Sequence, residues 1–264
     1  MTLTLATRMV SSEILKLRKK RSTMLWGLFL GGGSMVIYYA YAALDHASDP
    51  AHHGPAGGAL GFARGLQGLA ILIGPLAAAM IGTESGAGDI AAGVFRDLVA
   101  TGRSRIALFL ARIPAALLLT FACLAVGLAV GLTVAAVASF ALADGSATPH
   151  LGLIASGAGW VLLADAIVCV IAVGLGSLTG SRAITLTALI GWELVLSPQL
   201  LDASSLGSAR EVLIDGALVR IEPHPLPNGT PHLLMSILLV VVVMTLWPLV
   251  IGALGAWRTV TRDA

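Results

Sequence analysis

Charged residues are scarce in this sequence. Asp, Glu, Lys and Arg make up 11% of its 264 residues, whereas hydrophobic residues make up 57%. A water-soluble domain carries about 25% charged residues, so the shortage excludes an ordinary soluble protein and favours lipid as the solvent. The composition therefore predicts a protein that crosses the bilayer several times as helices.

Lysine and cysteine are also rare, and each shortage excludes a class of function. The only lysines are Lys16, Lys19 and Lys20, and none of them follows a glycine. A phosphate-binding loop needs Gly-x-x-x-x-Gly-Lys-Ser/Thr, so we expect no ATPase activity and no bound cofactor in this chain. The two cysteines, Cys123 and Cys169, lie in apolar runs, which indicates packing residues and not a disulfide framework or a metal cluster.

Apolar runs, in contrast, are abundant and long enough to cross a bilayer, which takes about 20 residues. Six of them occur, at residues 22–44, 66–83, 106–142, 151–178, 183–201 and 232–257. The first follows a basic segment, as a signal peptide would, but it exceeds the usual apolar length of roughly 7–15 residues and so favours a retained helix. The predicted fold is all-α, with a single six-helix transmembrane domain over residues 22–264.

Basic residues predict the orientation of the spans. With the N-terminus in the cytoplasm, only Arg64, Arg210 and Arg220 of the sixteen basic residues fall outside. Lys and Arg are retained on the cytoplasmic side, so both termini are expected there. The Ala- and Gly-rich composition favours a bacterial plasma membrane. All six histidines fall on the outer side: His46, His52, His53, His150, His224 and His232.

Residues 1–21 have the pattern of a basic amphipathic helix. Met9, Val10, Ile14 and Leu17 share one face, and basic side chains gather on the other. Such a helix is expected to lie at the interface of an anionic leaflet. A simple positively charged anchor for the first span explains the segment equally well.

A second amphipathic helix is predicted between spans two and three, at about residues 88–102. It is too short and too charged to span a membrane, and its own loop offers its apolar half no partner. The pattern leaves two interpretations open: the helix lies flat on lipid, or it docks into a groove on another protein. Its apolar half consists of Ile90, Ala91, Val94, Phe95, Leu98 and Val99, and its polar half of Asp89, Arg96 and Asp97.

The longest polar connection, residues 202–231, is expected on the outer side. It contains a predicted helix at 208–221, which opens with the capping-box pair Ser208 and Glu211 and is followed by a proline-rich turn. Apolar residues surround this helix, so we expect it to dip into the outer leaflet or to pack over the spans. An irregular loop is the alternative.

Two acidic residues fall inside predicted spans: Asp165 in the fourth and Glu193 in the fifth. An ionised group at membrane depth is costly, so both are candidates for a substrate path. A cationic substrate, a proton or a structural hydrogen bond would each account for them. Helix packing, or a side chain that reaches the interface, is the alternative.

The outer loop after the first span holds His46, His52 and His53 beside Asp45 and Asp49. Imidazoles and carboxylates in this combination are weak candidates for a copper or zinc site. A solvated, glycine-rich loop without metal explains them as well.

The order of these parts resembles the ABC-2 type (type V exporter) permease family. Locally, "SEILKLRKKRSTMLW" (12–26) is similar to the entry segment of those permeases, and "GTESGAGDIAAGVFRDLVATGRSRIALFLAR" (82–112) is similar to their first cytoplasmic loop. Arg112 stands where that family more often has Lys. The positions that match the loop are Glu84, Gly93, Leu98, Ser104 and Arg105.

The resemblance implies that residues 88–102 form a coupling helix, which sits in a cleft of a separate ATPase subunit. It implies two ATPase copies that carry ATP and Mg²⁺, a second copy of this chain or a similar permease, and no nucleic-acid partner. The expected cargo is a hydrophobic or amphipathic molecule such as a drug, an antibiotic peptide or a lipid. The residues expected to contact the ATPase are Glu84, Ile90, Val94, Phe95, Arg96, Asp97, Leu98, Arg103 and Arg105.

Other functions remain open at this point. A carrier or channel that needs no ATPase would be built from inverted repeats, and none is evident. A copper-related ABC permease would use the outer histidines. An intramembrane protease is disfavoured because no histidine lies in the core of a span and only one aspartate does. A structural assembly factor is a further alternative.

Overall fold

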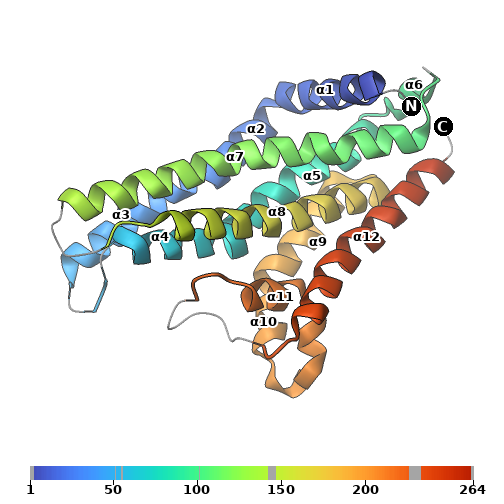
Figure 1. Cartoon of the computed structure of the whole chain (residues 1–264). Helices are drawn as coiled ribbons and strands as arrows, with labels where there is room; N and C mark the ends of the chain where they lie inside the picture. The colour runs from blue at the N-terminus through green and yellow to red at the C-terminus, as the bar shows by residue number, and fades with distance from the viewer. Residues whose placement is uncertain are drawn as a thin grey trace.

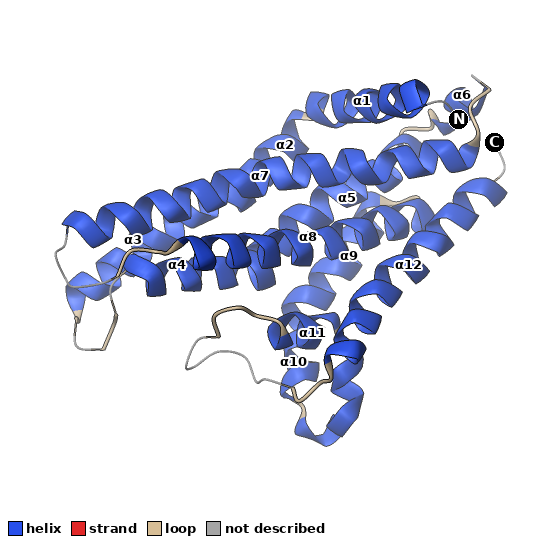
Figure 2. Ribbon diagram, viewed as in Figure 1, coloured by secondary structure: helices blue, strands red, loops and turns tan. Residues whose placement is uncertain are grey.

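The computed structural model describes residues 3–50, 52–54, 56–100, 102–141, 147–225 and 233–262. Within these ranges every regular element is a helix (Figure 2). Six helices are long and apolar enough to cross a membrane, which confirms the predicted all-α fold and number of candidate spans. They are Arg21–Ser48, Gly58–Ala91, Arg105–Ser139, Leu151–Thr179, Arg182–Asp202 and Ile237–Thr261.

Three of the spans are interrupted by a π-helical turn. The first span consists of α2 (Arg21–Leu28), the turn Phe29–Gly33 and α3 (Ser34–Ser48). The second consists of α4 (Gly58–Gln67), the turn Gly68–Ile73 and α5 (Gly74–Ala91). The fifth consists of α9 (Arg182–Gly191), the turn Trp192–Leu196 and α10 (Ser197–Asp202). Such turns often mark functional positions in helices.

The remaining spans are continuous helices, and they arrange around a central pair. The third is α7 (Arg105–Ala141), the fourth α8 (Leu151–Thr179) and the sixth α12 (Ile237–Thr261). The central helices are α5 and α8: the most apolar stretch of α8 is 67% buried, against 17% for α12. Figure 1 shows α9 and α12 splaying away from the bundle that α3, α4, α5, α7 and α8 form.

The second span is longer than the predicted 66–83, because polar and small residues extend it to Gly58–Ala91. Its glycines fit a close approach to α8: a Cβ at Gly82 would lie 2.6 Å from the backbone oxygen of Cys169. Close helix contact of this kind is typical of glycine in membrane bundles. Polar residues such as Glu84 stay in the helix because other helices supply their partners, as described below.

The helix expected at 88–102 is shorter than predicted. Residues up to Ala91 belong to α5, and a separate six-residue helix, α6, covers Phe95–Ala100. Gly93 separates them with a φ of +72°, a left-handed conformation that glycine adopts at low cost. The predicted single amphipathic helix is therefore wrong, although a short helix does lie between spans two and three.

The helix predicted at 208–221 is also corrected. A 3₁₀-helical segment covers Ser204–Val212, Leu213 is extended, and α11 covers only Ile214–Arg220. The capping-box pair therefore lies inside the 3₁₀ segment, one turn before the α-helix begins. Most of α11 is buried, and the indole nitrogen of Trp160 in α8 donates a hydrogen bond to the Leu218 carbonyl. The insertion thus packs over the spans. Residues 226–232 of this connection, His232 included, lie outside the described residues.

Both chain ends lie at the same end of the molecule, together with α1 (Leu3–Lys19) and α6 (Figure 1). We call this the basic end, because it carries Lys16, Lys19, Lys20 and Arg112. The α3–α4 connection and the segment from α10 to α11 lie away from it, and we call that side the acidic end. Six spans require both termini to share a side, so the arrangement agrees with the predicted number of crossings.

Candidate functional site

The apolar face of α1 packs against protein at the basic end. Met9 is buried in a small cluster with Leu108 and Ala111 of α7, and Leu98 and Val99 of α6 pack against the same cluster. The loop itself was expected to offer the apolar half of this helix no partner, and the two interpretations considered were lipid or another protein. The structure adds a third: part of that half packs against the N-terminal helix and the start of the third span.

Arg112 connects four helices at the basic end. Its side chain is only 1% exposed, and its guanidinium lies 5.7 Å from the ring centroid of Phe95 in α6. One nitrogen, Nη2, lies 3.0 Å from Oδ2 of Asp89 in α5, and Nη1 donates to the Gly86 carbonyl. The same Asp89 oxygen accepts a hydrogen bond from Lys16 of α1 at 2.8 Å. A buried arginine thus couples α7 to α1, α5 and α6.

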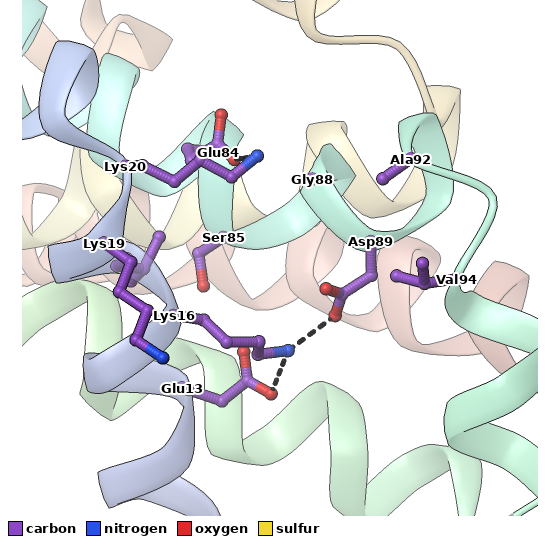
Figure 3. A pocket seen from close by; sticks show the side chains of 11 residues that line it. Glu13, Lys16, Lys19, Lys20, Glu84, Ser85, Gly88, Asp89, Ala92 and Val94 are labelled. Atoms are coloured by element: carbon purple, nitrogen blue, oxygen red, sulfur yellow. Dashed lines mark hydrogen bonds and ion pairs between the residues drawn. The ribbon is translucent and has the colours of Figure 1, made fainter.

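Glu84 forms a second junction nearby. Its Oε1 lies 3.0 Å from Nζ of Lys20, at the start of the first span, and 3.1 Å from Nη2 of Arg182, at the start of the fifth. Glu84 and Lys20, together with Asp89 and Lys16, line a cavity of about 230 Å³ between α1 and α5. Figure 3 shows the Glu84–Lys20 pair and the Asp89–Lys16 pair on successive turns of α5. We call Glu13, Lys16, Lys20, Glu84, Asp89, Arg112 and Arg182 the ion-pair cluster.

Burial shifts the pKa values of two groups in and near this cluster. Burial raises the pKa of Glu13 above its usual range, although Lys16 lies 2.6 Å away and opposes the shift. Burial, together with the charges of Arg258 and Arg112, lowers the pKa of Arg262 near the C-terminus. Arg105 at the start of α7 donates hydrogen bonds to the carbonyls of Val260 and Arg262. The C-terminal segment is therefore attached to the same end of the bundle.

The residues expected to contact an ATPase divide by exposure. Val94, Arg96, Asp97 and Arg103 are exposed at the basic end, and Ile90, Leu98 and Arg105 are half-buried. Phe95 and Glu84 are buried within this chain, so neither offers a surface to a partner. Of the ion-pair cluster, sequence reasoning named only Glu84 as a site residue. It missed the roles of the other six members: Glu13, Lys16, Lys20, Asp89, Arg112 and Arg182. The scarcity of charged residues was the signal that could have identified them. In so apolar a chain, an acidic residue close to a span is expected to have a basic partner.

Three carboxyl groups on the other side of the molecule lack such partners. Asp165 of α8 is completely buried, and neither of its oxygens has a hydrogen-bond partner among the described residues. Its carboxylate lies against the backbone of Gly74, where a Cβ would come within 2.6 Å of both oxygens. Glu193, in the π-helical turn of the fifth span, lies within electrostatic reach of both Asp165 and Asp215.

Asp215 of α11 completes this group, which we call the acidic trio: Asp165, Glu193 and Asp215. Its carboxylate accepts a hydrogen bond from the Ser197 hydroxyl. Burial raises the pKa of Asp215, and the Ser197 hydrogen bond opposes that shift. No ion pair in the described part of the chain involves any member of the trio. Sequence reasoning singled out Asp165 and Glu193 but did not single out Asp215, because it lies in a polar connection outside the predicted spans.

The histidines of the loop after the first span pair with aspartates. Nδ1 of His52 lies 2.8 Å from Oδ2 of Asp49, and Nδ1 of His53 lies 3.1 Å from Oδ2 of Asp45. His46 is hydrogen-bonded to the carbonyl of His53. Within the described residues no three His, Cys, Asp or Glu side chains come together as metal ligands would. The arrangement gives the copper or zinc hypothesis no support.

No known protein family, curated protein or solved structure matches this chain. The fold and the two groups of charged residues therefore carry the functional argument, together with the sequence resemblance described above.

Proposed function

We propose that the chain is the membrane-spanning subunit of an ATP-driven exporter similar to the ABC-2 type permeases. Its basic end lies in the cytoplasm of a bacterium, and a separate ATPase subunit binds there. Two ATPase copies and two membrane subunits, identical or similar, complete the transporter. The cargo is a hydrophobic or amphipathic molecule that leaves the cytoplasm or the inner leaflet.

The observation that carries this proposal is the mechanical connection of α6. The helix exposes Arg96 and Asp97, and the preceding Val94 is exposed as well, so the loop offers a mixed apolar and polar surface to a partner. Phe95, on the opposite face, packs on Arg112 and thereby connects α6 to α5, α7 and α1. Force applied to α6 by a closing ATPase would therefore reach the spans through buried contacts.

The docking surface can be tested by a substitution in it that should prevent the ATPase from binding. Val94 is 41% exposed, and Leu206 in the 3₁₀ segment of the acidic end is 40% exposed, so Val94→Asp and Leu206→Asp place the same charge at equally accessible sites. We expect an ATP-hydrolysing subunit to co-purify from native membranes with the wild-type chain and with Leu206→Asp, but not with Val94→Asp. Equal recovery with both variants, or no ATPase with the wild type, would refute the proposal.

Orientation can be tested independently. Cys123 and Cys169 are both completely buried, so a cysteine introduced at the exposed Arg103 provides the accessible thiol. In right-side-out vesicles we expect Arg103→Cys to resist a membrane-impermeant maleimide until the vesicles are opened. An introduced cysteine at Leu206 should react at once. The reverse pattern would place the basic end outside and exclude an ATPase partner there.

The acidic trio favours a second candidate function, a cation carrier that needs no ATPase. Uncompensated carboxylates within spans are typical of ion and proton pathways in carriers. Proteoliposomes that contain only this chain distinguish the two functions. An imposed ion gradient would drive cargo transport by a carrier, whereas the membrane subunit of an exporter would transport nothing without its ATPase.

A further inference from the structure

An apolar cavity opens beside Glu193, between α8, α9, α11 and α12. Its volume is about 260 Å³. Trp192 and Trp247 contribute aromatic walls, Glu193 contributes the one ionisable side chain, and the seven other lining residues are Val, Ile, Leu or Ala. Apolar walls with a single fixed polar group are typical of small-molecule sites, although this volume lies just below their usual range of about 300–1,000 Å³.

The cavity results from the way the last span crosses α8. Gly255 of α12 meets Gly174 of α8 so closely that a Cβ at Gly255 would lie 2.5 Å from the Gly174 carbonyl oxygen. From the basic end, α12 then diverges from α8 (Figure 1). The Trp247 indole nitrogen donates a hydrogen bond to the Val212 carbonyl, 2.9 Å away, just before α11. This bond fixes the ring at the wall of the cavity.

The acidic groups around the cavity lack basic partners. Glu193 borders the cavity, and Asp165 and Asp215 each lie within electrostatic reach of Glu193. No described basic side chain forms an ion pair with any of them. A cation in the cavity would therefore favour ionisation of the unpaired Glu193 carboxyl and pair with the resulting carboxylate in surroundings of low dielectric constant, where the attraction is strong.

We propose that this cavity binds a small lipophilic organic cation, with its positive group against Glu193 and the faces of Trp192 and Trp247 and its apolar part against the aliphatic walls. Aromatic faces attract cations, and tryptophan does so most strongly. A bare metal ion fits poorly, because the aliphatic walls supply no oxygen, nitrogen or sulfur ligands. A neutral acyl chain would contact the aliphatic walls but leave the Glu193 carboxyl without a partner.

The inference deepens the proposed export function, because it names the cargo as an amphipathic cation. It rests on that function only for the export of the bound cation. Binding itself needs this chain alone. If the purified chain binds the cation but no ATPase associates with it, the inference stands and the export function fails. If an ATPase associates and the cation does not bind, the inference fails and the export function stands.

The test is a calorimetric titration of the purified full chain, in a non-ionic detergent, with benzyltrimethylammonium. We expect saturable binding to the wild type and an affinity loss of more than about tenfold for Glu193→Gln, since truncating one partner of a buried charge pair has effects of this size. Asp202→Asn is the matched control: it removes the same charge from an exposed residue at the end of α10 and should leave the affinity unchanged.

A second variant fills the cavity without altering its charge. Ala188 lines the cavity from an exposed position on α9, so Ala188→Phe should fold normally and abolish binding. Neopentylbenzene is the uncharged isostere of the probe. It should bind weakly, and with the same affinity, to the wild type and to Glu193→Gln. The proposal is overturned if the wild type does not bind the cation, if Glu193→Gln or Ala188→Phe binds it unchanged, or if the neutral isostere binds as tightly as the cation.

Discussion

Two glutamates of almost equal burial have opposite ionic surroundings in this protein. Glu84 is 8% exposed and Glu193 is 9% exposed, and both lie within spans. Glu84 has two cationic partners, at 3.0 and 3.1 Å. Glu193 has no cationic partner among the described residues and lies instead near two further acids. Burial alone therefore does not distinguish a structural charge from a functional one.

The partners distinguish them. In the ion-pair cluster every acid faces a base. Glu13 pairs with Lys16 of its own helix, whereas Glu84 and Asp89 pair with bases from other segments, so their charges determine how those segments meet. In the acidic trio the compensation is absent, so each carboxyl either keeps its proton or needs a bound cation to offset the free-energy cost of ionisation. The first region is expected to hold the structure together, and the second to respond to a ligand.

The largest effect is expected from Arg112→Ala. The substitution removes the ion pair with Asp89 and the contact with Phe95, and it leaves the half-buried Asp89 carboxylate with Lys16 alone. Breaking a buried pair by removing one partner costs about 3–5 kcal/mol. Thermal unfolding in detergent should show a loss of this order, and Arg112→Lys should recover part of it by keeping the charge. An unchanged unfolding temperature for Arg112→Ala would contradict the assigned role.

A pair of identical substitutions sharpens the comparison directly. Glu84→Gln should destabilise the chain by about 1–3 kcal/mol, because its two partners lose charge-assisted hydrogen bonds but are exposed enough to be solvated. Glu193→Gln should have no destabilising effect, and it should raise stability if Glu193 is ionised. Unfolding temperatures of both variants, measured at pH 7 in the same detergent, decide the matter. Equal destabilisation by both would remove the distinction between the two regions.

A smaller, pH-dependent effect is expected at Asp215. Burial raises its pKa above the ordinary value of 3.8, so the folded state favours the protonated form. Stability from this group is present below about pH 3.8 and is lost as the pH rises through the elevated value. Asp215→Asn should therefore become progressively more stable than the wild type from pH 4 towards neutrality. The same difference at all pH values would mean that Asp215 does not titrate in this range.

Composition and periodicity were sufficient to predict the spans, because lipid imposes length and apolarity on each of them. Their ends were harder to predict. The second span continues to Ala91 because Glu84 and Asp89 find basic partners on other helices, and a hydropathy pattern contains no information on such partners. The π-helical turns were not predicted either, since they depend on packing more than on the order of residues.

The candidate sites were predicted in part. Acidic residues in apolar runs are conspicuous, so Asp165 and Glu193 could be identified from the sequence. Asp215 could not, because its burial depends on how α11 folds back over the spans. Phe95 was expected on a free surface, yet it packs on Arg112, seventeen positions away in the sequence. Contacts between segments decide such cases, and local patterns do not record them.

The smallest effect is expected where an acidic residue is paired but exposed. Asp49 holds His52 at 2.8 Å, but the side chains are 45% and 81% exposed, so solvent screens the pair. Asp49→Asn should change the free energy of unfolding by less than about 1 kcal/mol at any pH between 5 and 8. Chemical unfolding in detergent would measure this. A larger loss would show that pairing stabilises acids in this protein even without burial, and the contrast between Glu84 and Glu193 would then rest on partners alone.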